Sequence, residues 1–573
     1  MERAGTLALQ YLPQLTHTAL DHTPISARPR RPRFVLLTLV LAGLQVVPLP
    51  VRAQVRLPSL GESASDDLSI SAERRIGEQI MREGRRDPTY LDDPVLLDYL
   101  NTLWAPLVAA ARERGEIDAD TDRAFPFEAF LLGERSVNAF ALPGGFVGVH
   151  LGLIALTNTR DQLASVLAHE LAHVTQRHIA RSIAGTRTSS LVSVAALLLG
   201  VLAASRSNNV DIANAAITGG QAAAIQGQLN YSRDIEREAD RVGYGLLGAA
   251  GFATTGQADM FDRLDIATRL NDNGGFPYLR SHPLTVDRIS EARSRTLLTT
   301  SVPPGPPLAH ALMQMRARVL MDPAITSLQK LAGGETSSPV RKDQVAAAYA
   351  GALAASQLKD HVRADAHARQ ALKLQAGTTP AEPQADLALQ LLLAEVRLAG
   401  ANPGGALQAL AAAPAGLGAR PRLLLAAQAA LDQQRLQPGT GGTNSTGGTG
   451  GADAPELRRQ TEALQTWVAA EPQDAAAWQL LSATADAIGL GLRSLRAGAE
   501  AQAARGDITG AIDRMRAAQS AARTASVGQD FIEASVIDSR MRQLVAQRRQ
   551  LALELREAQG GRAPRDPNEL PFS

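Results

Sequence analysis

Residues 166–178 read VLAHELAHVTQRH and constrain the fold more than any other stretch of the sequence. Thr159, with glutamine three residues later, predicts a capped helix start, and apolar residues follow at helical spacing. On this helix His169 and His173 lie four residues apart, so both rings project from one face. Two such imidazoles can bind one zinc ion, and Glu170 stands beside them as a general base. The chain has only ten histidines, so a chance match has a probability on the order of 0.01.

A catalytic zinc ion usually takes three protein ligands and leaves one position open. Downstream, the stretch YSRDIEREADRVGYGLL places Glu236 and Asp240 four residues apart on one helical face. We expect Glu236 to bind zinc and Asp240 to hold the second ring nitrogen of a ligand histidine, with a solvated acidic face as the alternative. His178 lies five residues beyond His173 and is expected to be exposed and to point away from the metal.

Composition favours a mainly α fold. The chain has 573 residues, which predicts two to four domains, and its aromatic content is only 4%. Residues 69–84 and 94–115 show amphipathic helical patterns that end at glycines. Residues 125–154 contain short apolar runs and the turn sequence PGG, which predict a small sheet. The part that contains the histidine helix is therefore predicted to be α+β.

The N-terminus has the pattern of an export signal. A basic segment, RPRRPR, precedes the apolar run 34–47, and Val51 and Ala53 occupy the −3 and −1 places of a cleavage site. We predict a signal peptide over 1–53, cleaved after Ala53, with an uncleaved anchor as the alternative. Fourteen apolar residues fall short of the roughly 20 that a membrane-spanning helix needs.

Charge and cysteine content narrow the classes of partner and compartment. The formal net charge is +1, and removing the arginine-rich residues 1–53 leaves about −3, so no nucleic-acid partner is expected. Cysteine is absent, so an exported form has no disulfides and no thiol for lipid attachment. These features suit a large soluble periplasmic protein that is held together by packing or by a metal.

Two segments depart from the surrounding pattern. Residues 191–204 form an uncharged run that begins a hydrophobic insertion over 188–228, which we predict to be a hairpin against the membrane surface or over the cleft. Deleting this insertion is expected to weaken membrane association and to leave zinc bound. Residues 437–455 are rich in glycine and are predicted to be a flexible loop.

The C-terminal half carries a repeat signal. Trp478 and Leu481 are followed by GDITGAIDRMRAA, in which Ala511 and Ala518 lie seven residues apart. Small residues at this spacing let paired helices approach, and Trp478 and Leu481 are expected to face the same contact. A weaker copy places Ala364 and Ala371 in corresponding positions. The pattern predicts tetratricopeptide-like repeats over 303–560, and a generic alanine-rich bundle is the alternative.

Four motifs in order, NAFALPGGFVGVHLGLI, HELAH, EREAD and SHPLTVDRI, resemble the membrane-associated zinc metallopeptidases related to the CaaX prenyl proteases. The resemblance covers about residues 65–300. The export signal and the helical tail are similar to the periplasmic branch of this family, which supports assembly of outer-membrane β-barrel proteins and degrades stalled ones. The predicted domains are a signal peptide 1–53, a zinc metallopeptidase domain 54–302 and a repeat domain 303–560.

The resemblance implies that His169, His173 and Glu236 bind zinc and that Glu170 is the general base. It also points to His282, in SHPLTVDRI, as a residue that occupies the open metal position and restrains activity; from the sequence alone it is an ordinary loop histidine. The remaining candidates are Arg288, for the segment's structure or for transition-state contacts, and Asn138, Ala139 and Phe140, either in an edge strand that pairs with substrate or in a core strand.

The expected activity is zinc-dependent endopeptidase cleavage in the periplasm, with one zinc ion per chain. Expected substrates are unfolded or stalled outer-membrane proteins, and the repeats are expected to bind the outer-membrane assembly machinery. An alternative is a chaperone or adaptor in which the repeats dominate and His282 closes the metal site. An integral-membrane prenyl-protein protease is disfavoured, because no segment of about 20 apolar residues occurs.

Overall fold

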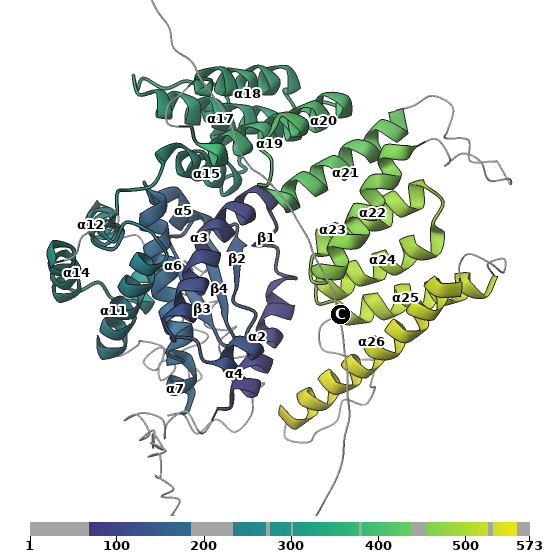
Figure 1. The fold of residues 1–573 in the computed structure, drawn as a ribbon, viewed down its shortest axis with the longest axis horizontal. Helices are drawn as coiled ribbons and strands as arrows, with labels where there is room; N and C mark the ends of the chain where they lie inside the picture. The colour runs from purple at the N-terminus through teal and green to yellow at the C-terminus, as the bar shows by residue number, and fades with distance from the viewer. Residues whose placement is uncertain are drawn as a thin grey trace, which may run out of the picture. The chain divides into compact units, whose positions relative to one another are not determined.

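The computed structural model describes residues 68–184, 233–270, 275–298, 302–377, 381–436, 454–524 and 531–558. The predicted signal peptide and the insertion 188–228 lie outside the described residues, as does nearly all of the loop 437–455. Within the described ranges the chain is mainly helical and carries one four-stranded sheet (Figure 1), which confirms the predicted fold class. Among these residues no helix is both long enough and apolar enough to cross a membrane.

The sheet belongs to the first half of the chain, together with the helices that carry the metal-ligand candidates. Ser69 caps the helix that begins at Ile70 by accepting a hydrogen bond from the Ala72 amide, and Asp93 caps the helix that begins at Pro94 by accepting one from Leu96. The elements are α2 (Ile70–Gly84), β1 (Tyr90–Leu91), α3 (Pro94–Glu113), α4 (Ala119–Ala124), β2 (Glu128–Leu132), β3 (Ala139–Leu142), β4 (Phe146–His150), α5 (Leu151–Leu156), α6 (Arg160–Thr175), α7 (His178–Ala184), α11 (Arg233–Ala249), α12 (Thr255–Leu270), α13 (Pro277–Ser281) and α14 (Val286–Leu298).

The sheet has the strand order β1-β2-β4-β3. The central strands β2 and β4 pair in parallel, and the edge strands β1 and β3 pair antiparallel with them. The β3–β4 hairpin turns at Gly144 and Gly145, with φ of +78° and +89°. A Cβ at Gly145 would lie 2.8 Å from the Cβ of Phe125, so glycine is required there. The turn predicted from PGG is present.

Helix α6 is buried on all sides. Every side chain from Asp161 to Val174 is buried, and the helix packs against α3, α11, α12 and β3. The contact with α11 is close: a Cβ at Gly243 would lie 3.1 Å from the backbone of Ala168. The sequence predicted a single apolar stripe, but alanines and polar residues on the other faces are buried as well. The metal-ligand histidines therefore lie in the protein interior.

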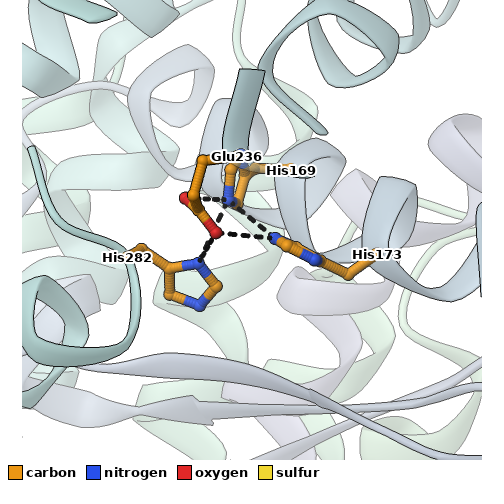
Figure 2. A group of neighbouring side chains, drawn as sticks. All are labelled: His169, His173, Glu236 and His282. Atoms are coloured by element: carbon orange, nitrogen blue, oxygen red, sulfur yellow. Dashed lines mark hydrogen bonds and ion pairs between the residues drawn. The ribbon is translucent and has the colours of Figure 1, made fainter. Parts of the chain in front are cut away.

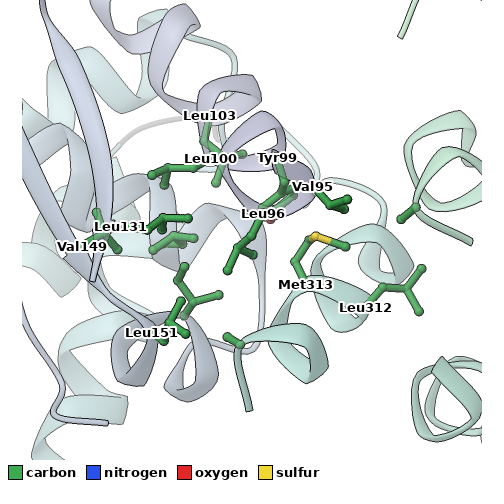
Figure 3. Packing of buried hydrophobic residues seen from close by; sticks show 14 of the residues in the cluster. Val95, Leu96, Tyr99, Leu100, Leu103, Leu131, Val149, Leu151, Leu312 and Met313 are labelled. Atoms are coloured by element: carbon green, nitrogen blue, oxygen red, sulfur yellow. The ribbon is translucent and has the colours of Figure 1, made fainter. Parts of the chain in front are cut away.

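The largest hydrophobic cluster lies between α3, the sheet and the helices that follow the first half of the chain. Leu96 and Leu100 of α3 and Leu131 of β2 are fully buried in it. Figure 3 shows Leu312 and Met313, from a later helix, in the same cluster. The packing that holds α6 against the sheet thus continues into the C-terminal half.

The C-terminal half is a succession of helices in which neighbours along the chain pack together. They are α15 (Pro307–Leu320), α16 (Ile325–Leu331), α17 (Arg341–Gln357), α18 (His361–Gln375), α19 (Pro383–Ala399), α20 (Pro403–Ala412), α21 (Ala419–Leu436), α22 (Pro455–Ala470), α23 (Ala475–Ala487), α24 (Gly491–Ala504), α25 (Ile508–Thr524) and α26 (Phe531–Ala558). Consecutive paired helices are compatible with the predicted repeats, whose assignment to the tetratricopeptide class stays a prediction.

The residues that suggested the repeats are buried, but they do not share one contact. Trp478 and Leu481 pack in a cluster formed by α21, α22, α23 and α24, and Ala511 and Ala518 pack in another formed by α24, α25 and α26. Helix α24 contacts both α23 and α25 and contributes residues to each cluster. Ala364, from the weaker copy, is also fully buried.

Candidate metal centre

The start of α6 sets the positions of its histidines. Thr159 caps the helix by accepting a hydrogen bond from the Gln162 amide at 3.2 Å. The Gln162 side chain accepts one from the Asn158 amide at 2.7 Å, one residue before the cap. The predicted capping pair is therefore present, but the glutamine side chain binds the amide of the residue before the cap instead of the amide of the cap residue itself. One turn apart further along the helix, His169 and His173 are 3% and 1% exposed.

Four side chains from three elements converge beside α6 (Figure 2). One ligand atom from each of His169, His173, Glu236 and His282 lies within 4.8 Å of the others. The Nε2 atoms of His169 and His173 are 3.1 Å apart, and Nε2 of His173 lies 3.5 Å from Oε1 of Glu236. Glu236 comes from α11, and His282 is the residue that ends α13. The structure thus brings together the three predicted ligands and the predicted fourth group.

His282 enters the cluster through Nδ1. This atom lies 3.0 Å from Oε1 of Glu236 and 3.3 Å from Nε2 of His169. Its other nitrogen, Nε2, lies 3.6 Å from Oε1 of Glu170. The side chain is 3% exposed, so His282 is inside the site and is not an ordinary loop histidine.

Glu170 is fully buried beside the cluster. Neither of its carboxylate oxygens has a hydrogen-bond partner among the described residues. An ionised carboxylate in the interior is costly unless something compensates it. This geometry leaves Glu170 ready to accept a proton from a group bound between it and the four-residue cluster.

Asp240 and Arg288 contact the predicted metal ligands without belonging to the four-residue cluster. Oδ1 of Asp240 lies 3.0 Å from Nδ1 of His169, as the spacing predicted. Arg288 binds both oxygens of Asp240, at 2.6 and 2.8 Å, and its Nη1 lies 2.9 Å from Oε2 of Glu236. The Arg288 guanidinium therefore faces the two carboxylates of α11, which favours the structural role over transition-state contacts.

The charges of these groups are strongly coupled. Burial would lower the pKa of His169, but hydrogen bonds with Asp240 and Glu236 raise it to about 10. Burial and the neighbouring His169 hold the pKa of His173 well below its usual range. Burial opposes ionisation of Glu236, but His282 and His169 hold its pKa well below the usual range. The carboxylates of Asp240 and Glu236 thus favour positive charge beside them.

The prediction for His178 was wrong. It was expected to be exposed, but it is fully buried, and its Nδ1 lies 2.9 Å from Nδ1 of His173. Burial lowers the pKa of His178 to about 4. The cause is a break in the backbone: α6 ends at Thr175, and Arg177 has a φ of +51°, so α7 starts in a new direction. Neither glycine nor proline marks the break, so the sequence pattern gave no signal for it.

The three candidate substrate-contact residues lie at the start of β3. Within the described chain β3 has β4 on one side and no strand on the other, so its edge position is compatible with strand addition. Just before it, Val137 donates a hydrogen bond to Gly275 and accepts one from Tyr278. Asn138 and Ala139 are buried, and Phe140 is partly buried. Their role stays a prediction.

These features define a metallopeptidase-type site in a mainly helical domain with a small sheet. Two buried histidines lie one turn apart, a glutamate is adjacent, and a second helix supplies a carboxylate ligand. Residues 113–296 match the sequence model of Peptidase family M48, so this part of the chain is similar to that family. The match confirms the predicted metallopeptidase resemblance, and the similarity to a metallopeptidase family together with the four-residue cluster supports a metal cofactor.

The chain is also similar to named proteins. The beta-barrel assembly-enhancing protease of Escherichia coli K12 is 34% identical over 251 residues, which cover 44% of this chain and 49% of the relative. Its Vibrio cholerae counterpart is 37% identical over 289 residues, which cover 50% and 57%. The mitochondrial metalloendopeptidase OMA1 of Schizosaccharomyces pombe is 29% identical over 230 residues, which cover 39% and 61%. The chain thus spans about half the length of the first two relatives.

Proposed function

We propose that this protein is a zinc-dependent endopeptidase of the periplasm that acts in quality control and assembly of outer-membrane β-barrel proteins. The observation that carries the proposal is the buried cluster of His169, His173, Glu236 and His282 beside the buried carboxylate of Glu170, which accepts no hydrogen bond from the described residues. Imidazole and carboxylate ligands suit zinc, and His-His-Glu is a ligand set of catalytic zinc. The names of the bacterial relatives support the substrate class.

In the proposed mechanism His169, His173 and Glu236 hold the metal. When bound, zinc supplies Lewis acidity that polarises a carbonyl and lowers the pKa of water to roughly 7. Glu170 accepts the proton of the attacking water and delivers it to the leaving amine, with no covalent intermediate. Oδ1 of Asp240, 3.0 Å from Nδ1 of His169, would keep Nε2 of that ring directed at the cluster. A substrate strand would pair with the free edge of β3.

The remaining parts of the proposal concern location and partners. We propose that residues 1–53 direct export and are removed, and that the insertion 188–228 contacts a membrane surface. The C-terminal helices would bind the outer-membrane assembly machinery, and unfolded or stalled outer-membrane proteins would be the substrates.

Metal removal tests the proposal directly. Purified residues 54–573 should carry about one zinc ion per chain, the number expected for a single catalytic site. The protein should cleave an unfolded outer-membrane protein, lose this activity with a chelator and regain it with added zinc. Metal analysis and a gel-based cleavage assay give the two measurements. Zinc content well below about half an equivalent, or cleavage that persists in chelator, would contradict the proposal.

The position of His282 favours a second candidate, a binding protein whose metal site is closed. Its Nδ1 lies among the ligand atoms, where it can take the position that a water needs. If so, His282→Ala should raise basal cleavage, including self-cleavage, and leave zinc content unchanged. The double variant with Glu170→Gln should be inactive. A fall in activity in His282→Ala at full zinc content would mean instead that His282 assists the reaction.

A further inference from the structure

His173 has a hydrogen-bond partner on each side of its ring. Its Nε2 faces the metal-ligand cluster (Figure 2), 3.1 Å from Nε2 of His169. Its Nδ1 faces away from the cluster, toward Nδ1 of His178 at 2.9 Å. The rings of His173 and His178 pack edge to face with centroids 4.9 Å apart. The ring of His178 therefore lies directly behind a predicted metal ligand.

The contact continues beyond His178. Nε2 of His178 lies 3.1 Å from Oε2 of Glu238, and Nη1 of Arg181 lies 3.2 Å from the same oxygen. Glu238 comes from α11, two residues after Glu236. A chain of polar groups thus runs from the cluster through His173 and His178 to Glu238, and it joins α6, α7 and α11.

The chemistry of imidazole allows one arrangement of protons along this chain. A neutral histidine that offers the Nε2 lone pair to a metal carries its proton on Nδ1. Nδ1 of His178 must then accept the hydrogen bond from His173, so the proton of His178 is on Nε2. That proton is donated to Glu238, whose carboxylate is an acceptor. Every group has the role that a metal ligand at His173 requires.

We propose that His178 is a positioning residue for the metal centre: it accepts the Nδ1 proton of His173 and so fixes the ring orientation and tautomer that bind the metal. The role corresponds to that of Asp240 at His169, and the proposal rests on the proposed metallopeptidase function. The two supports differ in charge. Asp240 places a carboxylate directly on its histidine, whereas at His173 the carboxylate of Glu238 is one ring further away and 31% exposed.

The test is zinc affinity in the full chain, measured by competition with a chromogenic chelator. His178→Phe keeps a planar ring and removes the acceptor, and it should weaken zinc binding about 10–100-fold, the usual effect of losing an outer-shell partner. His178→Asn places Oδ1 near the position of Nδ1 and should restore most of the affinity. His178→Gln places its amide near the position of Nε2 and should stay weak. If the Phe variant fails to fold, the comparison of zinc affinity between the Asn and Gln variants tests the proposal.

Ile179→Ala is the matched control on α7, because Ile179 is 5% exposed and adjacent to His178. It should lower the thermal midpoint and leave zinc affinity unchanged, which separates positioning from general destabilisation. Three results would each overturn this proposal without affecting the proposed function. They are equal zinc affinities for wild type and His178→Phe, equal losses of zinc affinity in the Asn and Gln variants, and a loss in Ile179→Ala that matches the loss in His178→Phe. A wild-type chain that binds no zinc would overturn the proposed function and this proposal with it.

Discussion

Glu170→Gln is expected to lower the rate of peptide cleavage by about 10²–10⁴-fold, the usual contribution of a general acid–base group. Glutamine has the same shape but cannot take a proton from water. Zinc content should stay near wild type, since Glu170 is outside the cluster formed by His169, His173, Glu236 and His282. The measurements are single-turnover cleavage of an unfolded substrate and metal analysis of the same sample.

Stability is expected to change in the opposite direction to activity in this variant. Glu170 is fully buried, and neither oxygen has a hydrogen-bond partner among the described residues, so removing its charge should relieve a desolvation cost. Metal-free Glu170→Gln should therefore have a higher thermal midpoint than the metal-free wild type. Exposed Glu113 on α3 provides the control, because Glu113→Gln should change neither quantity. Retained cleavage with zinc bound would show that another residue is the base.

The sequence predicted those parts of the site whose geometry depends on residue spacing within a single helix. His169 and His173 are one turn apart on α6, and Glu236 and Asp240 are one turn apart on α11, so residue spacing alone indicates their common faces. The caps and turn glycines that bound these elements are also local signals. Fold class followed from the same helical patterns together with the PGG turn.

The parts that the sequence did not predict depend on contacts between elements. His178 reaches His173 only because the chain turns at Arg177, which has a left-handed φ of +51° without being glycine. The parallel pairing of β2 with β4 places β3 at the edge, and nothing local in those strands specifies that order. The approach of His282 through Nδ1 depends on where α13 packs, since α6 and α13 are distant in sequence.

Among the residues outside the metal-ligand cluster, Arg288 is expected to have the largest effect on the stability of the protein and on its zinc affinity. It is 4% exposed and binds Asp240 with two nitrogens and Glu236 with a third. Burial opposes the charge on Arg288, but its hydrogen bonds to Asp240 raise its pKa further above the usual range, so the guanidinium stays ionised. Arg288→Met would leave two buried carboxylates without this cation.

Breaking a buried ion pair on one side typically costs about 3–5 kcal/mol, so metal-free Arg288→Met should be less stable by this order in chemical denaturation. Zinc affinity should also fall, because Asp240 loses the group that holds it against His169. Arg288→Lys should recover only part of the loss, since a single ammonium cannot bind both oxygens of Asp240 in the same way.

The control for Arg288 lies on the same helix, where Arg293 pairs with Asp262 and its side chain is 61% exposed. An exposed pair contributes at most about 1 kcal/mol, so Arg293→Met should leave both stability and zinc affinity close to wild type. Saturating zinc should widen the stability gap between Arg288→Met and wild type, because zinc stabilises the variant that binds it more weakly by a smaller amount. A gap that stays constant with zinc would show that zinc affinity does not depend on Arg288. A wild-type stability in metal-free Arg288→Met would show that the guanidinium is not needed to hold the two carboxylates.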